Sequence, residues 1–485
     1  MSVLNVVNVN GDHIDWTGIE TPERELVMKS SEQERYHEAN ARNRENLPRE
    51  HGFEPVARIE GSLPGGIDAT LYRNGPGIST RFGGPLGHAF EGDGALSAVR
   101  VRGDSATFAS KMIRTAEFLE EEERGKLLYG FGASWPRRFL NSLRGRAKTP
   151  ANVNVMHWQG KLFAVPEGAA PYAMDAESLE TLEQAPLGEL SAGYHSAHPH
   201  RIDAREALFS FRILWGKENA ISIFAYPDRG EAYELVRVPL DVTAYFHDFI
   251  ATPDHLIFVI PPVRIDILRA VAQIGPFEKL FRWKPEEGTR ILVVPIDAPE
   301  EYTWFEAEPF FVWHFANAFQ ERDRILVDLV HWPDFGSFEA VGSAEAKTTS
   351  TPSLRRISLD LANKSASVGM LSETPCEFPS VEAARSGYDA DRVWSQVERE
   401  GSSGIALHDL RQQRVKAFWF EPGQLASEPN LLATPHELLA TTLVYDLESH
   451  TSFLAMFEAN HIEDGPIAKV WLSHHIPMTF HGEWV

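Results

Sequence analysis

Four of the 19 histidines lie in sequence contexts that could supply a metal site. They are His198 in SAHPHRID, His247 in YFHDFIATPDH, His314 in VWHFANAFQERDR and His481 in HIPMTFHGEWV. Neutral imidazole is the commonest metal ligand among side chains. None of the four forms a short HxxxH or CxxC pair, so a metal ion would draw its ligands from distant segments. Taken singly, each histidine could equally be a surface or hydrogen-bonded core residue.

Three glutamates stand in apolar surroundings, where a carboxylate needs a partner. Glu167 interrupts LFAVPEG, Glu377 lies between Cys376 and Phe378, and Glu428 lies in SEPNLLATP. Burying an unpaired carboxylate costs several kcal/mol. Histidines bound to a metal need an acceptor for their second ring N–H, so the two sets of residues explain each other. The alternative is that each glutamate caps a turn or faces water.

The segments that would position these side chains have the sequence pattern of β-strands. From Phe53 onward, short runs of Val, Ile, Leu and Phe alternate with Gly, Pro, Asp and Asn, a pattern typical of strands. Examples are residues 161–167, 255–262, 290–297, 324–332, 441–448 and 451–459. Many short strands without intervening helices favour an all-β fold, and a β-propeller of four-stranded blades is the natural candidate. No WD or kelch motif repeats.

Three stretches depart from this pattern. Residues 1–50 are polar, with a helical pattern over 21–46, and we expect an N-terminal arm or loosely docked helix there. The remainder, 51–485, is expected to be a single domain with cap insertions at about 115–150 and 263–284. Within them, 135–148 and 263–284 combine apolar and basic residues, as in segments that contact a membrane surface. The alternative is a cap packed on the strands with solvated Arg and Lys.

Composition restricts the class of protein. Hydrophobic residues make up 43% and charged residues 24%, as in soluble globular proteins. The net charge of -23 opposes binding to nucleic acid. One cysteine excludes an internal disulfide framework and agrees with a reducing compartment. Without an 18-residue apolar run or a signal-peptide pattern, we expect a cytoplasmic enzyme with no obligate protein partner.

The contexts of the four histidines and three glutamates resemble those of the carotenoid cleavage oxygenase family. Two further stretches share this resemblance, EPVARIEGSLPGGIDATLYRNGPG (54–77) and GHAFEGDGALSAVRV (87–101). That family includes bacterial apocarotenoid oxygenases, lignostilbene dioxygenases and the retinoid isomerase of the visual cycle. The resemblance extends from about Phe53 to Val485, and the sequence is most similar to those of the bacterial apocarotenoid oxygenases.

The resemblance implies a fold and a metal. The expected fold is a seven-bladed β-propeller with a helical or loop cap over its top face, and Fe(2+) on its axis. The implied iron ligands are His198, His247, His314 and His481, and the implied acceptors for their imidazoles are Glu167, Glu377 and Glu428. His198 has no glutamate in this scheme. The neighbouring His195 and His200 are expected only to pack. Four imidazoles leave two positions of an octahedral ion for O₂ and substrate, so no separate acid or base is needed.

The resemblance also implies the reaction, which is cleavage of a carotenoid or apocarotenoid C=C bond by O₂ to give two aldehydes. Lignostilbene-type members carry a lysine and a tyrosine that bind the substrate phenol. The matching residues here, Pro166 and Met112, cannot share a phenolic proton, which disfavours a para-hydroxystilbene. Two alternatives stay open. One is cleavage of a stilbenoid or phenylpropanoid through another phenol-binding arrangement, and the other is a propeller that binds or isomerises an apolar ligand without cleaving it.

A polyene needs a tunnel lined by aromatic and aliphatic side chains. The positions that match the family's tunnel wall are Tyr245, Trp313 and Phe378, although each could be an ordinary core aromatic. Because polyenes dissolve in membranes and not in water, segments 135–148 and 263–284 would place the tunnel mouth against a lipid surface.

Overall fold

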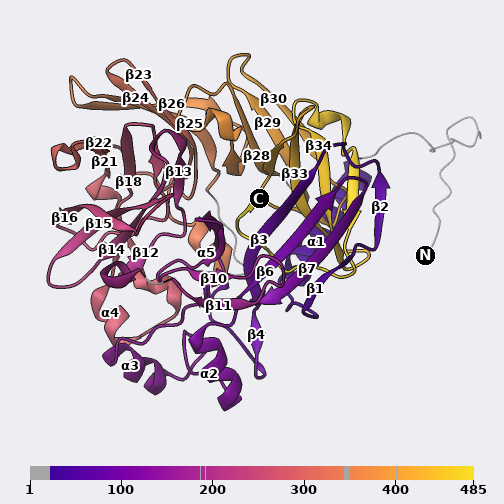
Figure 1. Ribbon diagram of the computed structural model, residues 1–485, viewed down its shortest axis with the longest axis horizontal. Helices are drawn as coiled ribbons and strands as arrows, with labels where there is room; N and C mark the ends of the chain where they lie inside the picture. The colour runs from indigo at the N-terminus through magenta and orange to yellow at the C-terminus, as the bar shows by residue number, and fades with distance from the viewer. Residues whose placement is uncertain (1–21, 186, 192, 343–349, 400) are drawn as a thin grey trace, which may run out of the picture.

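The computed structural model describes residues 22–185, 187–191, 193–342, 350–399 and 401–485. Seven antiparallel sheets, numbered here as blades 1 to 7, are arranged in a ring (Figure 1). The prediction of an all-β, seven-bladed β-propeller is confirmed.

Blades 1 to 4 occupy the first part of the ring. Blade 1 contains β1 (His51–Pro55), β3 (Asp68–Ile78), β6 (Asp93–Arg102), β7 (Ser105–Met112) and β36 (Gly482–Trp484). Blade 2 contains β8 (Asn154–Trp158), β9 (Lys161–Val165), β10 (Tyr172–Met174) and β11 (Thr181–Gln184). Blade 3 contains β12 (Tyr194–His195), β13 (His200–Ile202), β14 (Ala207–Leu214), β15 (Asn219–Pro227) and β16 (Tyr233–Leu240). Blade 4 contains β17 (Ile250–Ala251), β18 (His255–Ile260), β21 (Thr289–Pro295) and β22 (Thr303–Ala307).

Blades 5 to 7 complete the ring. Blade 5 contains β23 (Phe315–Glu321), β24 (Arg324–His331), β25 (Ser353–Asp360) and β26 (Ser365–Ser372). Blade 6 contains β27 (Cys376–Ser380), β28 (Arg392–Arg399), β29 (Ser402–Asp409) and β30 (Arg414–Trp419). Blade 7 contains β2 (Arg58–Gly61), β31 (Gln424–Ala426), β32 (Asn430–Ala433), β33 (Leu438–Asp446), β34 (Thr451–Glu458) and β35 (Ala468–Trp471).

The core lies between neighbouring blades. Phe211 of β14 and Phe258 of β18, in blades 3 and 4, have ring centroids 5.5 Å apart and belong to one buried cluster. Because each middle strand is covered on both faces, its apolar residues run nearly without interruption; all but the last residue of β14 are buried. This is why the sequence shows short continuous apolar runs in place of a strict alternation.

Strands from distant parts of the chain close the ring. β1 pairs with β7 at one edge of blade 1, and β2 pairs with β35 at one edge of blade 7. β36 pairs with β3, with Leu71 opposite Trp484, and the C-terminus lies near the middle of the ring (Figure 1). Both adjoining blades therefore combine early and late segments of the chain.

Three short helices form the cap at one edge of the molecule (Figure 1). They are α2 (Ala116–Arg124), α3 (Trp135–Leu143) and α4 (Ile267–Ala272), which fall within the two predicted insertions. Thr115 caps α2 by accepting the Phe118 N–H at 3.2 Å. The Trp135 indole on α3 donates to the Ala272 carbonyl of α4 at 3.1 Å, which joins the insertions. Two small hairpins lie outside the blades, β4 (Thr80–Arg81) with β5 (Gly84–Pro85) and β19 (Val263–Ile265) with β20 (Phe281–Trp283).

Two further helices lie close to the ring. α1 (Pro22–Arg42) packs on blade 7, where Ala39 is fully buried and Tyr36 contacts the cluster of Leu425, Tyr445 and Leu447. α5 (Ser337–Gly342) accepts a hydrogen bond at the Val341 carbonyl from Arg44, at 3.0 Å. Within the described ranges, no helix is long and apolar enough to cross a membrane.

Candidate metal centre

Four histidines converge at the inner strands of four blades. His198 lies between β12 and β13, His247 shortly before β17, and His314 and His481 directly before β23 and β36. One ring nitrogen of each lies within 4.8 Å of those of the others, and the side chains are at least half-buried. The structure thus brings together all four histidines singled out in the sequence.

Three of these imidazoles contact the three singled-out glutamates. The Nδ1 atom of His247 lies 3.0 Å from Glu167, that of His314 2.7 Å from Glu377, and that of His481 2.8 Å from Glu428. These contacts fix the tautomer in which Nδ1–H donates to the carboxylate and Nε2 keeps its lone pair. His198 has no glutamate partner among the described residues; its Nε2 faces that of His247 at 2.9 Å.

Each blade contributes one of these seven residues. The histidines come from blades 1, 3, 4 and 5. Glu167 follows β9 in blade 2, Glu377 lies in β27 of blade 6, and Glu428 lies between β31 and β32 of blade 7. The ring as a whole therefore positions the cluster.

The nitrogen atoms fit a bound cation. Because the Nδ1–H of His247 donates to Glu167, the Nε2 lone pair faces His198 at 2.9 Å, which is repulsive without a cation or proton between them. The Nε2 of His314 is buried without a hydrogen-bond partner in the described structure. Burial and the neighbouring histidines hold the pKa of His198 well below its usual value, so it stays neutral. Four neutral imidazoles suit a divalent transition metal.

The three glutamates differ in what stabilises their charge. Burial opposes ionisation of Glu428, but His481 and Arg73 lower its pKa to about 2. Arg73 is itself buried and donates to Glu428. Glu377 accepts from the Trp332 indole at 2.5 Å, and Glu167 from the Tyr245 hydroxyl at 3.4 Å. Of these three glutamates, only Glu428 pairs with an arginine or lysine side chain in the described structure.

The comparisons with known proteins agree with this geometry. Residues 44–485 match a family model described as "Retinal pigment epithelial membrane protein". The chain belongs to this family. Among its relatives, the apocarotenoid-15,15'-oxygenase of Synechocystis sp. is 28% identical over 88% of this chain and 92% of its own length. An isoeugenol monooxygenase of Pseudomonas nitroreducens is 25% identical over 88% of this chain and 94% of its own.

Solved structures show the same fold. A cobalt-substituted Synechocystis apocarotenoid oxygenase superimposes with a TM-score of 0.85 at 26% identity, over 93% of this chain and 98% of that one. The resemblance to carotenoid cleavage oxygenases inferred from the motifs is confirmed.

In this member of the retinal pigment epithelial membrane protein family, a cavity of about 390 Å³ adjoins the histidines. Trp313 and Phe378 line it together with His247, His314 and His481. The Phe378 ring stacks on His314 with centroids 4.9 Å apart. Tyr245 instead lines a second cavity, of about 270 Å³, between Glu167 and the cap. The three predicted wall residues thus lie on two cavities.

The structure adds residues that the motifs did not single out. Phe90 lines both cavities, and its ring centroid lies 6.4 Å from that of His247 and 5.4 Å from that of Phe480. Arg73 and Phe90 lie in YRNGPG and FEGDG, the segments that carry the family resemblance, which was their only sequence signal. Trp332 has no comparable signal.

Residues without an assigned role are accounted for by packing or pairing. His195 is buried against Phe224, and His200 pairs with Asp248 at 2.9 Å. Met112, at the position of the lignostilbene-type tyrosine, is buried in a cluster with Ala95 and Phe118.

Proposed function

We propose that the protein is a non-haem Fe(2+)-dependent dioxygenase. It cleaves a C=C double bond of a carotenoid or apocarotenoid with O₂ and forms two aldehydes. The observation that carries the proposal is the convergence of four histidines and three glutamates, one from each blade, beside an aromatic cavity.

His198, His247, His314 and His481 would hold the iron through their free ring nitrogens. When bound, the iron supplies the binding and activation of O₂. Glu167, Glu377 and Glu428 each hold the Nδ1–H of one imidazole, which fixes the ring and raises its basicity. No other acid or base of the chain is required.

Aromatic residues would exclude water and orient the alkene. Trp313 is fixed by donating its indole N–H to Ser337 at 2.8 Å, and its ring lies nearly perpendicular to that of His247 with centroids 5.0 Å apart. The Phe90 ring stacks against His247 and the Phe378 ring against His314. A rigid apolar substrate between these rings would present its double bond to the metal.

An aryl alkene is the second candidate. It is favoured by the match to an isoeugenol monooxygenase, and by fungal relatives described as resveratrol cleavage oxygenases. It is disfavoured by Pro166 and Met112 at the phenol-binding positions. A non-cleaving binder or isomerase has less support, since the full set of histidines and glutamates is present.

The deciding experiment is incubation of iron-loaded protein under air with an apocarotenal and, separately, a hydroxystilbene. We expect aldehydes from the apocarotenal, identified by mass spectrometry; in a parallel incubation under ¹⁸O₂, each aldehyde should carry one ¹⁸O atom. Cleavage of the stilbene alone would replace the substrate assignment by the second candidate. Intact substrates with the iron-replete protein would refute cleavage.

Further assignments concern domains and location. The proposed division is an arm, 1–50, and a single domain, 51–485, with cap insertions at about 115–150 and 263–284; the pairing of β36 with β3 supports the single domain. Contact of a cytoplasmic protein with a membrane surface through 135–148 and 263–284 is supported by exposed Leu143 on α3 and Leu268 on α4, 62% and 83% accessible. Arg137 and Arg146 lie within 4 Å of Glu120, which supports the alternative of a solvated cap.

A further inference from the structure

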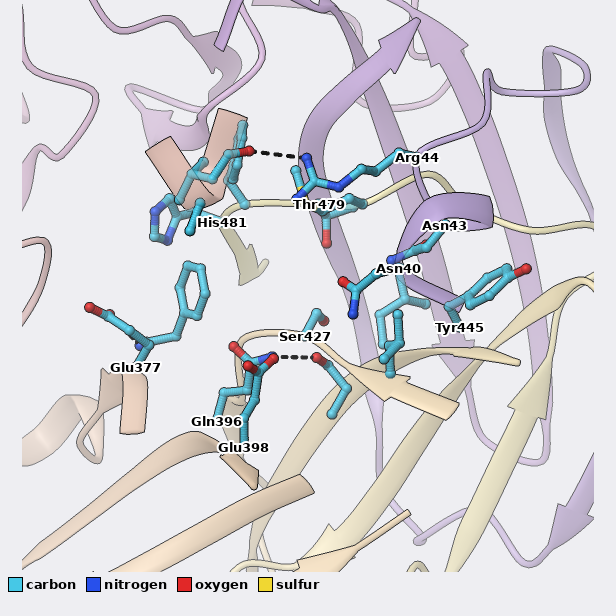
Figure 2. Close-up of a pocket in the computed structure, with 18 of the residues that line it drawn as sticks. Asn40, Asn43, Arg44, Glu377, Gln396, Glu398, Ser427, Tyr445, Thr479 and His481 are labelled. Atoms are coloured by element: carbon cyan, nitrogen blue, oxygen red, sulfur yellow. Dashed lines mark hydrogen bonds between the residues drawn. The ribbon is translucent and has the colours of Figure 1, made fainter. Parts of the chain in front are cut away.

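The cavity beside the histidines changes character along its length. Near the metal centre its wall is aromatic, with Phe90, Trp313 and Phe378. Beneath α1 the wall becomes polar (Figure 2). The residues of this polar end are Tyr36, Asn40, Asn43, Arg44, Gln396, Glu398 and Ser427.

One strand of blade 6 connects the two ends. Glu377, which holds His314, pairs in register with Gln396 of β28. Glu398 lies two residues further along β28 and therefore on the same face, about 7 Å beyond Gln396. A ligand that extends from the histidines along this strand would reach the Glu398 carboxylate.

Charged groups at the polar end lack counter-ions. Within the described parts of the chain, neither Glu398 nor Arg44 forms a salt bridge; Glu398 interacts with the Tyr36 hydroxyl, and Arg44 with the Val341 carbonyl. Burial raises the pKa of Glu398 and lowers that of Arg44; in the described structure Glu398 is met by neutral donors, the Tyr36 hydroxyl and the Gln396 amide, which donates at 3.5 Å. Yet the Glu398 side chain keeps accessible surface, as expected of a group that faces a cavity.

Several further polar atoms there are unused. Asn43 Oδ1, Arg44 Nε and Ser427 Oγ are buried without a hydrogen-bond partner in the described structure. Asn40 donates one N–H to the Tyr36 carbonyl at 3.2 Å, and its side chain also interacts with the Tyr36 hydroxyl, which Glu398 contacts too, so both side chains lie at one point of the cavity. A hydrocarbon chain end placed here would leave these groups unsatisfied.

We propose that this polar end binds a hydroxyl group at the remote end of the alkene substrate, which donates to Glu398 and accepts from Asn40. This inference rests on the proposed alkene cleavage and refines its substrate class. A hydroxyl fits because it both donates and accepts, whereas an aldehyde or ketone oxygen could not satisfy a carboxylate. The hydroxyl could belong to an end ring of an apocarotenoid or to a phenol.

The test uses two matched substrate pairs, an apocarotenal with and without a ring hydroxyl, and 4-hydroxystilbene with stilbene. For each pair we expect the ratio of kcat/KM values to identify the source of the hydroxyl. In the preferred pair, the hydroxylated member should be favoured by about 10-fold or more, the value of a hydrogen bond to a charged group. Equal values within both pairs would overturn the inference.

Variants link that ratio to the polar end. Glu398→Leu and, independently, Asn40→Leu should bring the ratio close to one, whereas Glu38→Leu, exposed on the same helix, should leave it unchanged. Circular dichroism and metal content verify folding. A ratio that persists in both folded cavity variants would refute the assignment of these residues.

Binding under argon separates this inference from the proposed reaction. Quenching of tryptophan fluorescence by each substrate gives dissociation constants without turnover. If the hydroxylated substrate binds more tightly but is not cleaved in air, the proposed reaction is refuted and hydroxyl binding at the polar end is kept. If the substrates are cleaved without any hydroxyl preference, the reaction is kept and hydroxyl binding is refuted.

Discussion

The Nε2 atoms of His198 and His247 lie 2.9 Å apart, although the residues belong to different blades and 49 positions separate them. Since the other nitrogen of His247 is engaged by Glu167, this approach of two ring nitrogens, in a group that includes His314 and His481, is a geometric sign of a cation site.

Removal of one histidine should empty the site. We expect the purified wild type to bind about one iron per chain, and His247→Ala to lose both the metal and the activity, because three neutral ligands remain and Glu167 is left without its partner. Iron is measured by plasma mass spectrometry. His436→Ala, at an exposed histidine, is the control. An active, iron-replete His247→Ala protein would contradict the ligand assignment.

The glutamates should differ in what their loss costs. Glu377→Gln and Glu428→Gln should each weaken metal affinity by about 10- to 100-fold, measured by chelator competition. Only Glu428→Gln leaves the buried Arg73 without a counter-ion, so it should also lower the free energy of unfolding by about 3–5 kcal/mol. Equal unfolding free energies for the two variants would show that Arg73 is compensated elsewhere.

Metal binding should weaken as the pH falls. Although burial lowers the pKa of His314, Glu377 raises it above the ordinary value of 6.5. A protonated imidazole has no lone pair for a metal, so protons compete with the ion below that pKa. We expect the metal affinity to decline as the pH falls through the raised pKa of His314. Glu377→Gln removes the charge that raises the pKa and should shift the decline to lower pH, whereas an unshifted profile would assign the titration to another group.

A buried ionic network should hold the cap on blade 1. Lys148 contacts Asp93 at 2.9 Å and Glu121 at 3.2 Å, with all three side chains almost fully buried. Lys148→Met would leave both buried carboxylates to share one cation, Arg81, and should lower the free energy of unfolding by about 3–5 kcal/mol. Lys279→Met breaks an exposed pair with Glu339 and should cost about 1 kcal/mol or less. Denaturant unfolding compares them, and similar costs would mean that the network is not structural.

Contact with lipid should depend on the exposed leucines of the cap. Leu143→Glu combined with Leu268→Glu should abolish co-flotation with anionic vesicles, because both side chains would place a charge in the acyl region. Leu182→Glu, at a leucine of similar exposure in blade 2, serves as the control. Flotation that survives the double substitution would identify α3 and α4 as a solvated cap.

The strands and the seven central residues could be predicted from the sequence, but for different reasons. Strands such as β14 can be recognised in the sequence because both of their faces are buried, which gives a continuous run of apolar residues. His198 and Glu428 were singled out by their local contexts, but those contexts left other interpretations open, and only the family motifs assigned each residue a role.

The rest depends on contacts across the ring. Arg73 of blade 1 contacts Glu428 of blade 7, and Trp332 reaches Glu377 from another blade. The docking of α1 on blade 7 through Ala39 could not be predicted from the sequence either, because the α1 segment contains few apolar residues. Such partners follow from ring closure and not from neighbouring sequence.

The position of His481 beside β36 also determines when, during synthesis of the chain, the histidine cluster becomes complete. A nascent chain that has reached blade 5 presents only three of the four imidazoles and one of the three carboxylates, namely Glu167. With the proposed set of four ligands, we expect metal loading to wait until residue 481 has left the ribosome and β36 has joined β3, so a product stopped short of it should stay metal-free however much of the propeller has folded.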